Sequence, residues 1–114
     1  MAMHQAAARA YQTQAARRGL RDQEADVFRR VTGGLRAAKA NPLLQGRAVA
    51  DNVRLWLMVG DVLRDPANAL PAELRAGIVS VGQALQREMA LREPDLDFLI
   101  QVNEGVTAGL SGTP

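Results

Sequence analysis

The spacing of apolar residues constrains this chain most, because they recur every three or four positions in each long segment. That spacing is typical of helices with one buried face, since 3.6 residues make one turn. No stretch shows the strict alternation, or the enrichment in β-branched and aromatic residues between turns, that indicates a strand. The sequence therefore predicts an all-α fold, a single compact domain of about five helices over residues 1–114, with 1–5 and 111–114 frayed.

The first two predicted helices precede Asn41-Pro42. Residues 3–18 are rich in alanine, with Ala7, Tyr11 and Ala15 on one line, and Gly19 ends this segment. Asp22 is a candidate N-cap for the second helix. Proline disfavours the helical conformation in the residue before it, so the second helix ends at Asn41. Its predicted buried line is Val27, Phe28, Val31, Leu35 and Ala38.

Three more helices follow, separated by prolines. The third is predicted from about Leu44 to Arg64, where Asp65-Pro66 ends it. Pro71 with Glu73 opens the fourth, because proline needs no N–H in the first turn and a carboxylate favours the positive helix end. The fifth starts at Pro94-Asp95. The predicted inner lines are Leu74, Ile78, Val81 and Leu85, then Leu96, Leu99, Ile100, Val106 and Leu110, and Gly77 and Gly82 beside the first line are expected to let another helix approach closely.

Two asparagines lie where this pattern calls for apolar side chains. In the third helix the charged side is Arg47, Asp51, Arg54 and Asp61, and the opposite side is Val49, Asn52, Trp56, Val59 and Leu63. Asn103 takes the same kind of position in the fifth helix. A buried amide without partners costs about 1 to 3 kcal/mol, so Asn52 is predicted to bond to a backbone group. In one interpretation the asparagines, with Trp56, anchor the fold by fixing a helix end or the loop DPANALP in register; in the other they line a groove and pair with a partner's backbone.

Leu57 and Met58 make the third helix apolar nearly all round for one turn. A helix that is apolar on all sides is usually enclosed by its neighbours. The alternative is an open groove beside Met58 that accepts an amphipathic helix, a use that suits the flexible methionine side chain.

The residues needed for common catalytic chemistry are missing. The chain has no cysteine, which excludes disulfides, thiolate metal sites and a thiol nucleophile. Its one histidine, His4, lies near the N-terminus, and Glu93, Asp95 and Asp97 surround a helix start, where carboxylates offset the dipole. We therefore expect no enzyme activity, no cofactor and no metal.

Charge and hydropathy bear on location and partners. The formal net charge is +2, but residues 1–57 carry a net +6 and residues 58–114 a net −4. No secretory signal or membrane span is evident, so a cytoplasmic protein with no membrane insertion is expected. The basic half gives an alternative hypothesis of nucleic-acid binding, and neighbouring carboxylates and the small number of aromatic residues argue against it. Its candidate contacts are Arg17, Arg18, Arg21, Arg29 and Arg30.

Five stretches together resemble one known family. They are AY at residues 10–11, E-x3-F at 24–28, NVRLW at 52–56, NALPAELRAGIVS at 68–80 and IQVNEGVTAGL at 100–110. In this order and spacing they resemble the FlaF family of flagellar biosynthesis regulators of alpha-proteobacteria. The resemblance implies a small cytoplasmic helical protein without enzyme activity. It also implies a requirement in flagellin production and export, alongside the translational regulator FlbT.

The resemblance suggests three functional hypotheses. The leading one is a secretion chaperone or export regulator that binds the amphipathic terminal helices of flagellin in a groove beside Phe28, Leu57 and Met58. The runner-up is a post-transcriptional regulator that contacts flagellin mRNA, alone or with FlbT, through the arginines named above. The third is a structural adaptor within the export apparatus.

Overall fold

The structure, a computed structural model, describes residues 25–110, with side chains described up to Ala108. Residues 25–40 are helical, and they are followed by the 3-10 turn η1 (Pro42–Leu44), α2 (Gln45–Arg64), α3 (Ala72–Met89) and α4 (Leu96–Leu110). No strand occurs between residues 25 and 110. The all-α prediction is confirmed. Four of the five predicted helices are present, and the first, residues 3–18, lies outside the described residues.

Short polar side chains hold the connections at the predicted breaks. The Asn41 side chain accepts a hydrogen bond from the backbone N–H of Leu43 at 3.1 Å, beside Pro42. After α2, the Asp65 carboxylate accepts from the N–H of Ala67 at 2.9 Å. Before α4, the Asp95 carboxylate accepts from the N–H of Phe98 at 3.1 Å, the bond of a helix N-cap. Local chemistry therefore fixes where the helices begin and end.

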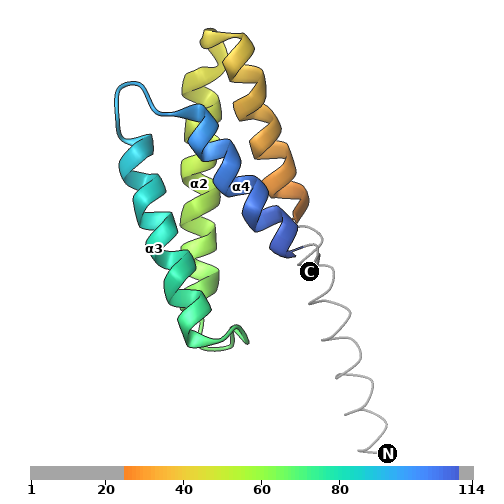
Figure 1. Cartoon of the computed structure of the whole chain (residues 1–114), viewed down its shortest axis with the longest axis vertical. Coiled ribbons are helices and arrows are strands. Elements are labelled where there is room, and N and C mark those ends of the chain that lie inside the picture. The colour runs from red at the N-terminus through yellow and green to blue at the C-terminus, as the bar shows by residue number, and fades with distance from the viewer. Residues whose placement is uncertain (1–24, 111–114) are drawn as a thin grey trace, which may run out of the picture.

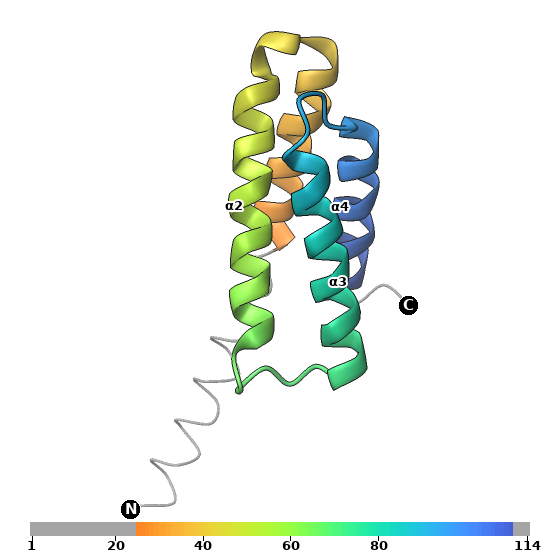
Figure 2. The same ribbon diagram turned by 90° about the vertical axis from the view of Figure 1, so that its left-hand side faces the viewer.

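The four helical segments lie side by side along the long axis of the molecule (Figures 1 and 2). Segment 25–40 is linked to α4 by two exposed ion pairs, Arg36 with Glu104 and Lys39 with Asp97. α2 packs against α3 in the opposite direction. The buried core cluster is drawn from all four segments and consists of Phe28, Leu35, Ala38, Ala48, Leu55, Trp56, Leu85, Met89, Leu99 and Ile100.

α3 approaches α2 closely at Gly82. A Cβ atom placed on Gly82 lies 3.2 Å from Cε3 of Trp56, tighter than ordinary contact, whereas one on Gly77 meets nothing within 4 Å. The expectation of a close helix approach is therefore right for Gly82 and wrong for Gly77.

This difference gives a matched pair of substitutions within one helix. Gly77→Ala is expected to raise the free energy of unfolding by about 0.5 to 1 kcal/mol, because alanine is the better helix former and the site is open. At Gly82→Ala the same gain is offset by displacement of the Trp56 ring, so stability is unchanged or lower. Urea unfolding of both variants measures the difference, and equal stabilisation by the two would contradict the close contact.

At one end of the molecule α2 and α3 extend past the other two segments (Figures 1 and 2). Along one line of α2, Leu55 is 3% exposed but Val62, seven residues on, is 39% exposed. Along the inner line of α3, Leu85 is 0% exposed and Leu74 is 50% exposed. Because i and i+7 share a helix face, these residues have the correct phase for a core but no neighbour covers them within residues 25–110. We call residues 58–64 with 72–81 the open end.

The prediction that Leu74 and Val81 are buried is therefore wrong, and the reason is the length of the neighbouring helices. Both side chains lie on the inner flank of α3, but they are exposed. Ile78 is half-buried, and Leu85 is buried as predicted. Met89, which the predicted line omitted, completes the buried line at the other end of α3.

Candidate functional site

The centre of the bundle holds a buried polar cluster formed by Asn52, Trp56, Met89 and Asn103. Both asparagines are fully buried, as predicted. The Asn103 side chain donates to Oδ1 of Asn52 at 2.7 Å and accepts from the indole N–H of Trp56 at 2.9 Å. The remaining amide bond runs from Nδ2 of Asn52 to the Met89 sulfur at 3.2 Å, a weak acceptor. The cluster joins α2, α3 and α4 across the core.

The prediction that these asparagine side chains bond to backbone groups is wrong, because the side chains of Asn52 and Asn103 bond to each other. The loop DPANALP is fixed by its own side chains instead. Asn68 donates to the carbonyl of Val62 at 3.2 Å and accepts from the N–H of Leu70 at 2.9 Å. Full burial also means that neither Asn52 nor Asn103 lines a groove that a partner's backbone could enter. The role of these two residues and Trp56 as fold anchors stays a prediction, and the unfolding of alanine variants is the measurement that checks it.

Phe28 does not take part in an accessible groove, which corrects the predicted partner-binding set. Its side chain is buried, and its ring packs edge to face on Trp56 with centroids 6.0 Å apart at 86°. The predicted apolar line of the second helix places Phe28 inside, and its burial confirms that placement. An aromatic ring enclosed in the core cannot contact a partner without unfolding the bundle.

Leu57 and Met58 are exposed, at 57% and 37%, so α2 is not enclosed by its neighbours at this turn. They lie on opposite flanks of its solvent face, because Arg54 and Asp61, both exposed, project between them. Leu57 lines a hollow of about 200 Å³ between α2 and α3, next to Gly60 and Gln83. Met58 lies on the other flank, one turn before Val62. A single groove containing both residues is therefore excluded.

The open end is the candidate binding surface that the structure presents. Its exposed apolar side chains are Met58 and Val62 of α2 and Leu74 and Val81 of α3. Half-buried Val59 and Ile78 lie between these two pairs on the inner faces of the helices. The surface is thus the continuation of the core, left without the other two helices.

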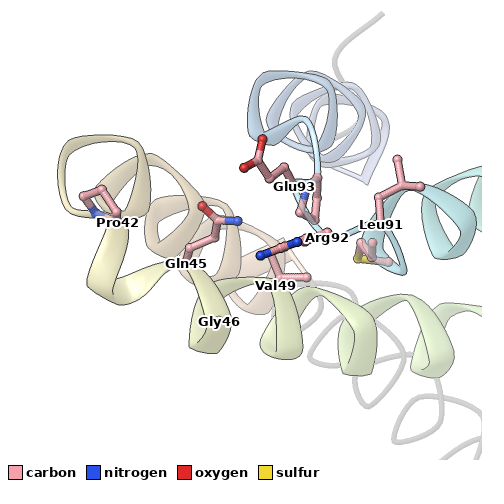
Figure 3. Close-up of a pocket in the computed structure, with 9 residues that line it drawn as sticks. Pro42, Gln45, Gly46, Val49, Leu91, Arg92 and Glu93 are labelled. Atoms are coloured by element: carbon pink, nitrogen blue, oxygen red, sulfur yellow. The ribbon is translucent and has the colours of Figure 1, made fainter.

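A second hollow, of about 600 Å³, lies at the opposite end of the bundle (Figure 3). One wall comes from η1 and the start of α2, and the other from the residues that follow α3. Arg92 extends toward α2 beside Val49, with Gln45 on α2 and Glu93 on the stretch that follows α3 (Figure 3). The lining brings together one guanidinium, one carboxylate and one amide. Among the described residues no group of three His, Cys, Asp or Glu side chains could hold a metal ion.

Comparison with known protein families shows what kind of protein carries these features. The model of the flagellar protein FlaF family matches residues 7–110, nearly the whole chain. The chain belongs to the FlaF family. Comparisons with curated proteins and with solved structures gave no significant match.

Membership of the FlaF family shows a role in flagellar biogenesis. FlaF proteins are a family associated with the flagellum and not a known enzyme family. The match extends beyond the described helices at the N-terminal side, since it starts at residue 7 and the described residues start at 25. It ends at Leu110, the last residue of α4. No helix within residues 25–110 is long and apolar enough to cross a membrane.

The candidate RNA-binding arginines of this FlaF protein fall into two groups. Arg29 and Arg30 are exposed on segment 25–40, and Arg29 forms an ion pair with Asp26 at 2.8 Å. Arg17, Arg18 and Arg21 lie outside the described residues. The structure therefore places only Arg29 and Arg30 of the five candidate contacts.

Proposed function

We propose that this FlaF protein binds the terminal helical segments of flagellin, as a chaperone or regulator of flagellin synthesis and export, and that the open end is where it binds them. The observation that carries this proposal is the uncovered inner face of the α2–α3 hairpin. Helices that are amphipathic and unpaired before assembly, as the flagellin termini are, need an apolar surface of this kind to avoid premature association.

The size of the surface is consistent with reversible binding. Burying a large apolar side chain fully is worth about 1.5 to 3 kcal/mol, so a half-exposed one can add about 1 kcal/mol. Met58, Val62, Leu74 and Val81 together could therefore contribute several kcal/mol before the entropy of association is subtracted. A chaperone that must release its client at the export apparatus needs binding of moderate strength.

The test is a calorimetric titration of flagellin into the purified full chain and into two variants of the open end. Val62→Glu and Leu74→Glu are each expected to weaken binding by at least about tenfold, because the carboxylate would be buried against an apolar helix. Leu43→Glu is the matched control, since Leu43 is equally apolar but lies in η1 at the other end of the bundle. Its affinity should equal that of the unaltered protein.

Flagellin lacking both terminal segments supplies the second control, and it should not bind. Equal binding of the truncated flagellin, or equal loss in Leu43→Glu, would sink the proposal. Salt-sensitive binding of flagellin mRNA by the protein, alone or with FlbT, in the absence of flagellin binding would favour the post-transcriptional alternative.

A further inference from the structure

The open end lies next to the point where residues 1–24 join the described chain. Ala25 is buried and is three residues before Phe28, whose ring contacts Trp56. Val62 is six residues after Trp56 on α2, which runs in the opposite direction. At about 1.5 Å per residue, Ala25 reaches about 4.5 Å past Phe28, and Val62 lies about 9 Å past Trp56. The chain before Ala25 therefore starts about one turn short of the uncovered side chains.

We propose that residues 3–18 of this same chain dock as a helix on the open end, with Tyr11 as the main apolar anchor. The sequence predicts that segment to be helical, with Ala7, Tyr11 and Ala15 on one line. A tyrosine can place its ring against Val62 or Leu74 and keep its hydroxyl in water. The flanking alanines have short side chains, so they do not hold the tyrosine ring away from these apolar residues.

The lengths agree with this arrangement. A helix over residues 3–18 is about 24 Å long, and the exposed residues of α3 from Leu74 to Val81 span only about 10 Å. Residues 19–24, which include Gly19, can cover up to about 20 Å when extended. The segment can therefore turn back at Gly19 and lie across both helices of the open end.

Charge favours the same contact. Residues 1–21 contain four arginines, Arg9, Arg17, Arg18 and Arg21, and no carboxylate. The open end and the loop that closes it carry the exposed carboxylates of Asp61, Asp65 and Glu73 together with Arg64 and Arg75, a net charge of −1. Asp61 has a local partner in Arg64, but at 3.5 Å with both side chains well exposed. Such a surface pair is weak, so the carboxylate remains available to an incoming arginine.

The tether makes this segment a stronger competitor for the surface than a second copy of the protein. A segment joined by a short flexible linker has an effective concentration in the millimolar range, well above that of a dilute protein. The family model also matches residues 7–24, so most of the docking segment belongs to the region that defines the FlaF family. Docking on the chain's own open end gives this part of the family region a structural role.

The experiment measures how fast a thiol at the open end reacts. The chain has no cysteine, so Val62→Cys introduces a single reactive thiol for a maleimide reagent. Adding Tyr11→Asp is expected to raise the labelling rate roughly tenfold, the effect of losing one large apolar contact. Leu43→Cys, at the other end of the bundle, should label at one rate with or without Tyr11→Asp. An unchanged rate at position 62 would overturn the proposal.

Three further measurements keep the result interpretable. Circular dichroism checks the fold of each variant, and Leu74→Cys replaces Val62→Cys if the latter is misfolded. Protection that increases with protein concentration would show that a second copy covers the surface, which would also overturn the proposal. Benzoylphenylalanine at position 11 should crosslink within the monomer to residues 58–81, and crosslinks only elsewhere would contradict docking.

The docking has a regulatory consequence that rests on the proposed function. The segment and flagellin would compete for one surface, so Tyr11→Asp should tighten flagellin binding by the factor by which it raises the labelling rate. If the rate rises and the affinity does not, the segment docks but flagellin binds elsewhere. If neither flagellin nor its termini bind at all, the labelling result still decides the docking.

Discussion

Replacing Asn103 by alanine is expected to lower the free energy of unfolding by about 3 to 5 kcal/mol. The substitution removes two hydrogen bonds at once, the one accepted from Trp56 and the one donated to Asn52. It leaves the indole N–H and the Asn52 carbonyl oxygen buried without a partner, at about 1 to 3 kcal/mol each. Bulk water does not reach these groups, since Asn52, Trp56 and Asn103 are enclosed by the core. This is a large fraction of the roughly 5 to 15 kcal/mol by which a typical domain is stable.

Asn52→Ala should lower the free energy of unfolding by less, about 2 to 3 kcal/mol. It leaves one N–H of the Asn103 amide without an acceptor and removes only a weak bond to the Met89 sulfur. The double variant should lose less than the sum of the two, since the bond between the asparagines is counted in both. Urea unfolding followed by Trp56 fluorescence measures all three. Gln101→Ala, an exposed amide on α4, is the control and should change stability by less than about 0.5 kcal/mol.

Equal stabilities for Asn103→Ala and Gln101→Ala would show that the cluster does not anchor the fold. A loss in Asn52→Ala larger than in Asn103→Ala would instead contradict the central position of Asn103 in the network. Either result can be read from the same set of unfolding curves.

The helix boundaries could be predicted because they depend on residues that are neighbours in the sequence. Asn41-Pro42, Asp65-Pro66 and Pro71 act on their immediate neighbours, so the ends of α2 and the start of α3 fall within one residue of prediction. Helical phase also needs only the local pattern. It correctly placed Asn52 and Asn103 inside, because each shares a face with apolar residues of its own helix.

The partners of those asparagines could not be predicted, since they depend on how helices meet. Asn52 and Asn103 are 51 positions apart, and their side chains meet only once α4 crosses α2. The apolar line of a helix shows which way its side chains face, but it does not identify the residue opposite. Backbone partners were predicted because buried side-chain amides need hydrogen bonds and most often form them with backbone groups. The two asparagines meet that need by bonding to each other.

The candidate site was missed in part for a related reason. Helical phase places Leu74 and Val81 inside, but phase gives the direction of a side chain and not the length of the helices that could cover it. Val62 lies outside the predicted inner line of its helix. The predicted helix lengths give no signal either, because the second helix, from Asp22 to Asn41, and the third, from Leu44 to Arg64, are of similar length. Nothing in their apolar patterns shows where along α2 the neighbouring helices stop covering it.

Phe28→Ala is expected to lower the free energy of unfolding by about 3 to 5 kcal/mol, the usual cost of removing a buried aromatic ring. The substitution opens a cavity beside Trp56 and abolishes the edge-to-face contact between the two rings. Met58→Ala, on the solvent side of α2, should cost less than about 1 kcal/mol. Thermal and urea unfolding of the two variants give the comparison.

Flagellin binding separates a structural role of Phe28 from a contact role. Phe28→Leu keeps most of the buried volume, so the folded fraction stays high and the affinity for flagellin should equal that of the unaltered protein. Met58→Ala keeps the fold and, on the proposed function, should weaken binding by about threefold to tenfold, as expected for a partly buried side chain. The opposite pattern, with weaker binding in Phe28→Leu and none lost in Met58→Ala, would mean that the bundle opens at Phe28 to admit its partner. The burial of Phe28 under Trp56 argues that it stays closed.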